Sequence, residues 1–381
     1  MRSSIQAVIG ERGRWLAQQN SLWAYAVGRP LPQTDAGEID QEAVENLWKT
    51  SNTPLRIDLL KTFRSLNPDA AREMLSTTWK QEKAKDRATF LDLLQPNLSL
   101  ADEPFLEAAL CDRAQDVRAE AGRLLAYLPD AQYCQRMAER VPTYVQFGDN
   151  IVTIQLPQED DVWKNEGLAP LAGNRGKRAS LLSQIVAAVP LGRWAGNPSA
   201  LINTVESHPH SAAVLEGWTL AAQRQAHVTW AQALIQYWLR QPEATILPKA
   251  QFIFDLLPVE DLETQLEEWL NGFQSDAAVW EDALNNLASL GPAPSLELSE
   301  RLWIFIKTNL YQQLRRAKQA YQVRSHLQSL AHYLHPDLVH EIDAYIHNLE
   351  IEVLSTYHQD SLIQFRNTLH FRQALWSTFD T

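Results

Sequence analysis

The chain has 381 residues, of which 45% are hydrophobic and 21% are charged, and its formal net charge at pH 7 is −12. This composition is typical of a soluble globular protein. The acidic excess lies in residues 141–306, which carry 9 basic and 19 acidic side chains. Because nucleic-acid binding rests on Lys and Arg that neutralise phosphates, this balance argues against a nucleic-acid partner.

The sequence predicts neither a secretory signal nor a membrane span. Residues 1–9 carry one Arg and only a weak apolar run, and no stretch of 18 uncharged apolar residues follows. The two cysteines, Cys111 and Cys134, form no CxxC pair and lie among apolar residues on expected helices. We therefore expect two buried free thiols in a cytoplasmic protein.

The N-terminal part of the chain is expected to be helical. Residues 3–27 predict a helix pair around Gly10 and Gly13, and residues 29–37 predict a loop. Capping residues and prolines then indicate successive helices over 40–48, 52–66, 67–81 and 84–94. A further helix opens at Pro129 and ends near Arg140.

The clearest pattern in the chain runs from Asp102 to Leu128. Asp102 is the expected N-cap of a first helix, and Pro104 stands where a missing N–H costs nothing. Apolar residues recur at helical spacing on both sides of a polar turn at 112–115. Two short helices with one apolar face each cannot bury those faces alone, so this unit needs neighbours.

A shift of 46 residues brings a neighbouring segment onto this unit. It places Leu59 on Phe105, Leu60 on Leu106, Ala71 on Val117, Arg72 on Arg118 and Trp79 on Leu125. The offset lies in the roughly 40–47 residue period of HEAT and armadillo repeats, which this stretch resembles. We interpret Arg72 and Arg118 as bridges between adjacent repeats. We also expect Trp79, Phe105, Val117 and Leu125 to be buried.

The pattern changes after residue 140. β-forming residues flank Gly148, Asp149 and Asn150, which predicts a small inserted β-hairpin near 143–156. The fold class predicted from the sequence is therefore all-α, an α-solenoid of HEAT- or armadillo-like helix pairs with this one hairpin. A loop with Glu159, Asp160 and Asp161 follows the hairpin.

Residues 173–178 read Gly-Asn-Arg-Gly-Lys-Arg just before a helix expected over 179–189. Glycines and basic side chains at a helix N-terminus can hold an anion, which makes Arg175, Lys177 and Arg178 candidate anion ligands. The segment lacks the spacing of a Walker A motif. A surface loop without a ligand is the alternative, and the spacing favours it.

Helical patterning resumes over residues 190–290 and includes one acidic helix face. The acidic residues of that face are Glu260, Asp261, Glu263, Glu267 and Glu268. The Gly-Pro-Ala-Pro run at 291–294 is the best candidate boundary. We therefore predict three segments: 1–140 with HEAT-like repeats, 141–290 with the hairpin and further helical repeats, and 295–381 with long helices.

The sequence predicts no catalytic residue, cofactor or metal. Seven histidines lie in the last segment, but no three of them have a spacing that converges on one ion. We expect scattered, partly exposed histidines instead. Neither GxSxG nor HExxH occurs in the chain.

Six short stretches carry a resemblance to a known family. They are residues 11–16 (Glu-Arg-Gly-Arg-Trp-Leu), 102–107, 116–118, 128–129, 184–191 and 221–225. They resemble an uncharacterised bacterial family whose genes lie beside those of MoxR-type AAA+ ATPases, von Willebrand factor A-domain proteins and SWIM zinc-finger proteins. The resemblance implies a fold more than a chemistry, because these motifs are structural and the family has no agreed catalytic residues.

We expect a non-enzymatic scaffold or adaptor that works with a MoxR-type AAA+ ATPase or a von Willebrand factor A-domain protein. A basic protein surface would dock on Glu159, Asp160 and Asp161 and on the helix of residues 260–268, with the hairpin beside it. A solvated surface that only keeps the chain soluble is the simpler alternative. Two further hypotheses are a HEAT-like enzyme acting on nucleic acid and a module that responds to phosphate or nucleotides through residues 173–178.

Overall fold

A computed structural model describes residues 31–379, with gaps at 35–36, 149–150, 159–160, 169–175, 241–252, 273–294, 317–319 and 350–353. The described residues are mostly helical and include one small two-stranded antiparallel sheet. Contacts divide the chain into two compact units, Met1–Arg193 and Trp194–Thr381. The helix pair expected over residues 3–27 lies outside the described residues. The predicted boundary at 140–141 falls inside the first unit.

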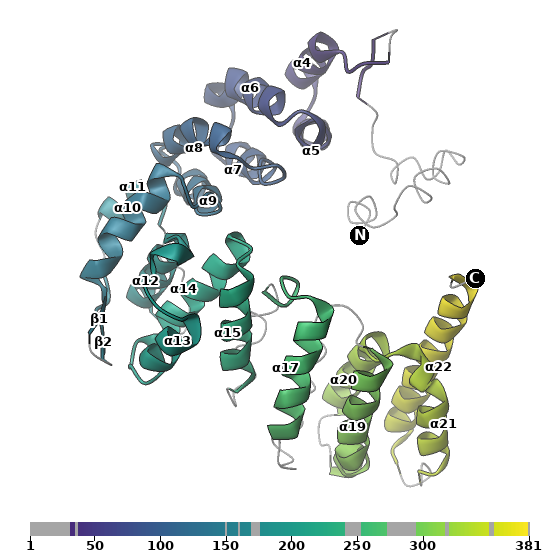
Figure 1. The fold of residues 1–381 in the computed structure, drawn as a ribbon. Coiled ribbons are helices and arrows are strands. Elements are labelled where there is room, and N and C mark those ends of the chain that lie inside the picture. The colour runs from purple at the N-terminus through teal and green to yellow at the C-terminus, as the bar shows by residue number, and fades with distance from the viewer. Residues whose placement is uncertain are drawn as a thin grey trace. The chain divides into compact units, whose positions relative to one another are not determined.

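The first unit contains short helices and the hairpin (Figure 1). Its elements are α4 (Gln41–Thr50), α5 (Thr53–Leu66), α6 (Pro68–Thr78), η2 (Trp79–Gln81), α7 (Ala84–Asp92), η3 (Leu100–Asp102), α8 (Glu103–Leu110), α9 (Gln115–Leu125), α10 (Gln132–Arg140), η4 (Val141–Thr143), β1 (Val145–Phe147), β2 (Val152–Ile154), α11 (Asp161–Asn165), α12 (Lys177–Ala188) and η5 (Leu191–Arg193).

The predicted helix starts in this unit are confirmed by their caps. The side chains of Asp40, Asn52 and Asn67 accept hydrogen bonds from the backbone N–H groups at the starts of α4, α5 and α6. Asp102 does not follow the same pattern. It ends η3, and its carboxylate accepts from Ser99 N at 3.0 Å instead of capping α8. Asp102 therefore stands at the predicted N-cap position of α8, but its side chain makes no capping hydrogen bond to that helix.

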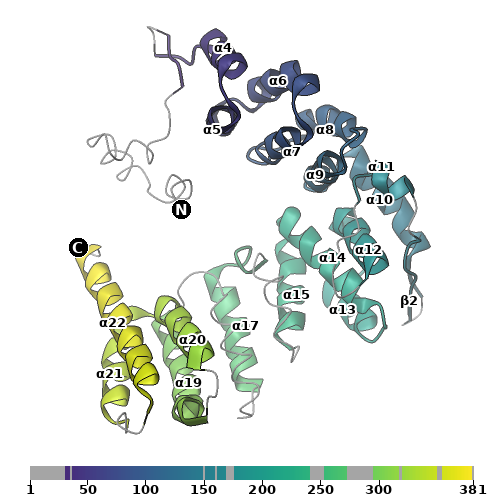
Figure 2. The same ribbon diagram turned by 180° about the vertical axis from the view of Figure 1, so that it is seen from behind.

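The helices of the first unit form two rows (Figures 1 and 2). Helices α5, α7 and α9 pack on one another in one row, and α4, α6 and the η3–α8 segment form the other. The helices α5, α7 and α9 begin at residues 53, 84 and 115, so 31 residues separate equivalent positions. The offset of 46 residues instead superposes α5 on α8, which belong to opposite rows, and it is not the spacing of stacked neighbours.

The core of the first unit fills the space between these rows. Val117 and Leu125 are fully buried, as expected. Trp79 and Phe105 are only half-buried, and their rings pack edge to face with centroids 5.0 Å apart. The expectation of two buried thiols is half right, because Cys134 is buried whereas Cys111 is exposed.

The predicted hairpin is confirmed. Strands β1 and β2 pair antiparallel, with Val145 opposite Ile154 and Phe147 opposite Val152. Val145, Val152 and Ile154 are buried, so one face of the hairpin packs on the unit. Residues 149–150, between the two strands, lie outside the described residues.

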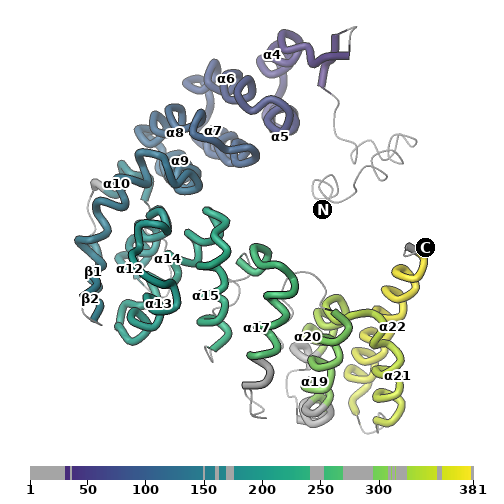
Figure 3. Tube along the Cα trace, in the orientation of Figure 1, coloured from purple at the N-terminus to yellow at the C-terminus, as the bar shows by residue number. Residues whose placement is uncertain are grey.

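The second unit is helical throughout its described part (Figure 3). Its elements are α13 (Pro198–Glu206), α14 (Ser211–Arg224), α15 (Val228–Leu239), α17 (Val259–Gly272), α19 (Leu296–Arg316), α20 (Ala320–Tyr333), η6 (Pro336–Leu338), α21 (Val339–His347) and α22 (Thr356–Phe379). Here too a helix packs on the next one and on the next but one, as α13 does on α14 and α15 and as α20 does on α22.

Aromatic side chains fill the core of the second unit. Trp218 of α14 is fully buried between Trp194 and Trp230. Trp303 of α19 is fully buried against Tyr345 and Phe365. None of the helices placed by the structure combines the length and the apolar character that crossing a membrane requires.

Candidate functional site

A repeated arginine links the helices of one row in the first unit. Arg56, Arg87 and Arg118 each stand fourth in their helices, α5, α7 and α9, and lie 31 residues apart; we call them the arginine ladder. Arg56 pairs with the carboxylate of Glu82, which precedes α7. Arg87 pairs with the carboxylate of Asp112, which precedes α9, at 2.8 Å. Each of these two arginines therefore binds the acid in front of the next helix of its row.

Arg87 and Arg118 also bind backbone carbonyls. Arg87 donates to the carbonyl of Glu82 at 2.6 Å, and Arg118 donates to the carbonyl of Asp112 at 2.6 Å. Arg118 further reaches the carbonyl of Lys164 at 2.8 Å. Guanidinium groups with several donors suit such bridging. The ladder therefore links successive helices, and the role of these side chains is structural.

A second cluster is fully buried between α5, α6 and η3. Arg64 and Asp102 have no exposed side-chain surface, and their two hydrogen bonds measure 2.6 and 3.0 Å. The remaining donors of Arg64 go to the carbonyls of Pro68, Pro96 and Asn97. Every guanidinium N–H is thus directed at a protein acceptor, as a buried charge requires.

Asp102 is the centre of this cluster. Besides Arg64 it accepts from Arg72 at 2.9 Å and from Ser99 N at 3.0 Å. Burial alone raises the pKa of the Asp102 carboxyl, but the hydrogen bonds from Arg64, Arg72 and Ser99 outweigh it, so this pKa lies below its ordinary value. The carboxylate is therefore an ionised anchor with filled hydrogen-bonding positions.

The interpretation of Arg72 and Arg118 as bridges agrees with these contacts. Arg72 reaches a carboxylate 30 residues ahead, and Arg118 reaches a carbonyl 46 residues ahead. Their positions are nevertheless not equivalent, since Arg118 belongs to the ladder with Arg56 and Arg87. A search for one residue type at a fixed spacing of 31 would have found the ladder in the sequence.

The structure describes two of the three predicted anion ligands, Lys177 and Arg178. Arg178 donates to the carbonyls of Pro157 and Leu156 at 2.7 and 2.6 Å, so it holds the segment that follows the hairpin. Lys177 is exposed at the first position of α12. Arg175 lies outside the described residues. An anion site at these residues therefore stays a prediction. Arg178 already binds two backbone carbonyls.

The predicted acidic docking residues fall in both units. Glu159 and Asp160 lie outside the described residues, and Asp161 begins α11 of the first unit. The other five lie on α17 of the second unit. Glu260, Asp261 and Glu268 are exposed there. The docking surface stays a prediction.

Two acids of α17 have partners at or just before the start of α19 or within it. Glu263 accepts a hydrogen bond from Ser295 N at the start of α19, and Glu267 pairs with Arg301 at 3.1 Å. A carboxylate at a helix N-terminus is favourable for that helix. These two side chains therefore help to dock α19 on α17, and only the exposed three are available to a partner in solution.

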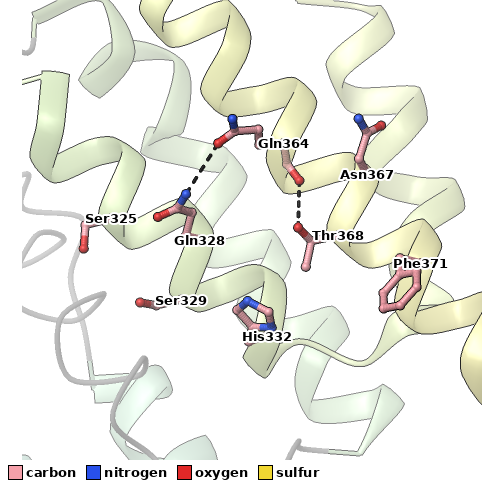
Figure 4. Close-up of a pocket in the computed structure, with 8 residues that line it drawn as sticks. All are labelled: Ser325, Gln328, Ser329, His332, Gln364, Asn367, Thr368 and Phe371. Carbon is pink, nitrogen blue, oxygen red and sulfur yellow. Dashed lines mark hydrogen bonds between the residues drawn. The ribbon is translucent and has the colours of Figure 1, made fainter. Parts of the chain in front are cut away.

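An open groove lies between α20 and α22 (Figure 4). Its volume is about 730 Å³, which lies in the range of ligand sites. Its lining residues are Ser325, Gln328, Ser329 and His332 of α20 and Gln364, Asn367, Thr368 and Phe371 of α22. No Asp, Glu, Lys or Arg stands among these eight residues. Gln328 and Gln364 point toward each other and share a hydrogen bond of 3.4 Å.

The sequence patterns did not reveal this groove. On each helix the lining residues recur at i, i+3, i+4 and i+7, which is also the pattern of a solvated helix face. The usable signal was the absence of Asp, Glu, Lys and Arg from both stripes and the repetition of the stripe 39 residues later, as in Ser325 and Gln364. Within the described ranges, no group of three or more His, Cys, Asp or Glu could hold a metal ion.

The chain was compared with curated proteins and with models of protein families. Comparison with curated proteins finds no match. Residues 1–379 match the family described as "Family of unknown function (DUF5691)". The match spans nearly all 381 residues and both compact units. The chain therefore belongs to this family of unknown function, DUF5691.

Proposed function

We propose that the protein is a non-enzymatic scaffold, an α-solenoid of HEAT- or armadillo-like helix pairs that presents its helix faces to a protein partner. The arginine ladder carries this proposal. Arg56 and Arg87 join helices that begin 31 residues apart by the same side chain at the same helix position, as expected for repeats stacked on their neighbours. Stacked repeats offer extended surfaces for a partner.

The candidate partners come from the family resemblance. The stretches given in the sequence analysis resemble a family encoded beside MoxR-type AAA+ ATPases and von Willebrand factor A-domain proteins. Charge adds a second reason, because Glu260, Asp261 and Glu268 are exposed on α17. An acidic surface attracts a basic partner surface over a distance that salt shortens.

A pulldown from the native host tests the proposal. The full chain carries an affinity tag, is expressed at its natural level and is cross-linked before lysis, and the recovered proteins are quantified by mass spectrometry. We expect recovery of the MoxR-type ATPase or of the von Willebrand factor A-domain protein well above a tag-only control. Recovery of both at the level of that control would overturn the proposed partnership.

A further inference from the structure

The two polar stripes of the groove run side by side in the same direction. Gln328 of α20 bonds to Gln364 of α22. Further along both helices, Arg372 of α22 donates to the carbonyls of Ala331 and Leu334 at the end of α20, at 2.7 and 2.6 Å. The residue numbers rise together on both helices, so α20 and α22 are parallel. The groove between them therefore has amide and hydroxyl groups on both walls.

The amides of the groove have unused hydrogen-bonding capacity. Each amide has two donor hydrogens and an acceptor oxygen. Among the described residues, the side chain of Asn367 has no hydrogen bond, and the only one between Gln328 and Gln364 is long, at 3.4 Å. All three amides are exposed. They can thus exchange bound water for the donors and acceptors of a ligand.

The size and chemistry of the groove match an extended peptide. Ser325 and His332 are seven residues apart, which corresponds to about 10 Å along a helix. An extended chain covers that length with about three residues, and each residue has one N–H and one C=O. A charged side chain would lose water in this groove without gaining a partner of opposite charge, so the lining disfavours it.

One end of the groove offers an apolar contact. Phe371 is 65% exposed and lies at the end of the α22 stripe, and Leu375 is exposed one turn further on. An exposed aromatic ring of this kind can bury a partner's apolar side chain. The polar walls would then bind the backbone, and this end would select one side chain.

We propose that the groove between α20 and α22 binds an extended, uncharged segment of a protein partner, with one apolar or aromatic side chain of that segment on Phe371. The proposal rests on the proposed function, since it assigns a site to the scaffold. It differs from the acidic surface on α17 in its response to salt. Binding through neutral hydrogen bonds and apolar contact is nearly independent of ionic strength, whereas steered docking on carboxylates is not.

The test uses the full chain and a displayed library of random heptapeptides as the probe. Enriched peptides are synthesised, and their Kd values are measured by fluorescence polarisation at about 50 mM and about 300 mM salt. We expect the peptides to lack charged residues, to contain an apolar or aromatic residue and to keep their Kd within about twofold between the two salts. No enrichment, or enrichment of charged peptides, overturns the proposal.

Variants locate the binding on the chain. The double variant Gln364→Ala/Asn367→Ala should raise the Kd about tenfold, as the loss of two hydrogen bonds predicts. Asn348→Ala is the matched control, because Asn348 is an exposed amide just after α21 and outside the groove. It should leave the Kd unchanged. Circular dichroism melts should show equal folding of all variants, since the substituted side chains are exposed. Equal Kd values for the double variant and the wild type overturn the proposal.

The same variants separate this proposal from the proposed function. If the wild type recovers its partner from the host and Gln364→Ala/Asn367→Ala recovers it equally well, the groove is not the site while the scaffold function stands. If the wild type recovers neither candidate partner but the peptides bind in the groove, the proposed partnership fails and the groove stands.

Discussion

Replacing Arg64 by Met should destabilise the first unit by about 3–5 kcal/mol, the usual cost of breaking a buried ion pair by removing one partner. The structure gives the reasons. Asp102 would stay fully buried with Arg72 and Ser99 N as its remaining donors. In addition, the carbonyls of Pro68, Pro96 and Asn97 would lose the donors that Arg64 supplies.

The assay is urea unfolding of the full chain together with hydrogen exchange. Because a chain of two compact units need not unfold in one step, the exchange rates of amides in α5, α6 and α8 report on the first unit separately. Arg72→Met is the matched control. Arg72 binds the same carboxylate, but its side chain is 20% exposed and also pairs with Asp69. We expect it to cost about 1 kcal/mol, as partly exposed ion pairs do.

Two outcomes would refute the reasoning. One is a loss below about 1 kcal/mol for Arg64→Met, which would mean that water reaches Asp102. The other is an equal loss for Arg64→Met and Arg72→Met. The double variant Arg64→Met/Asp102→Leu should recover the part of the loss that comes from the unpaired Asp102 carboxylate, because a buried ion pair replaced by apolar side chains is often neutral, whereas the three carbonyls still lack the donors of Arg64.

Three further predictions concern packing, pH and the acidic helix. Phe105→Ala should lower the free energy of unfolding by about 1–3 kcal/mol, measured in urea, because Phe105 is half-buried against Trp79. A fully buried ring would cost roughly 3–5 kcal/mol. A loss above about 3 kcal/mol contradicts the half-buried placement. Because the pKa of Asp102 is lowered in the folded state, its ionised form contributes stability that is complete above the ordinary pKa of 3.8 and is lost as the pH falls below that pKa. The stability advantage of wild type over Asp102→Asn should therefore shrink in acid. An advantage that is the same at pH 7 and in acid contradicts this prediction. Reversal of the three exposed acids of α17 to Lys should weaken recovery of a basic partner most at low salt, and should lower the melting temperature only slightly, because Glu260 and Asp261 lie in the first turn of α17. Unchanged recovery would mean that these acids are only a solvated surface.

Helix starts and the hairpin could be predicted because their signals are local. Asn52 and Asn67 cap the helices that begin directly after them, and two short runs of β-forming residues close together in the sequence pair as strands. Such hydrogen bonds form within one turn of chain. They depend little on what packs against the element later, so they can be placed from the sequence.

The repeat spacing could not be predicted so easily. Both rows of the first unit expose one apolar face at the same helical period, so a shift of 46 residues superposes α5 on α8 as plausibly as a shift of 31 superposes α5 on α7. The apolar residues of a helix do not indicate to which row that helix belongs. Arg56 and Arg87 of the ladder do indicate the row, because each binds the acid before the next helix of its own row.

The groove of the second unit could not be predicted from the sequence for a related reason. The stripe that ends at His332 and the stripe that ends at Phe371 each look like a solvated helix face. They become the walls of one site only because α20 and α22 lie parallel and in contact, an arrangement set by packing between segments 36 residues apart.

The sequence by itself determined where the chain is helical, where the hairpin turns and which segment holds the acidic excess, because caps, turns and charges act over a few residues. Only the tertiary structure decided which helices are neighbours. It brought Arg64 to Asp102 over 38 residues and made an apparent N-cap into the buried centre of an ion cluster. The physical reason is that a side chain's partners across the fold depend on how apolar faces pack, and many packings satisfy the same local pattern.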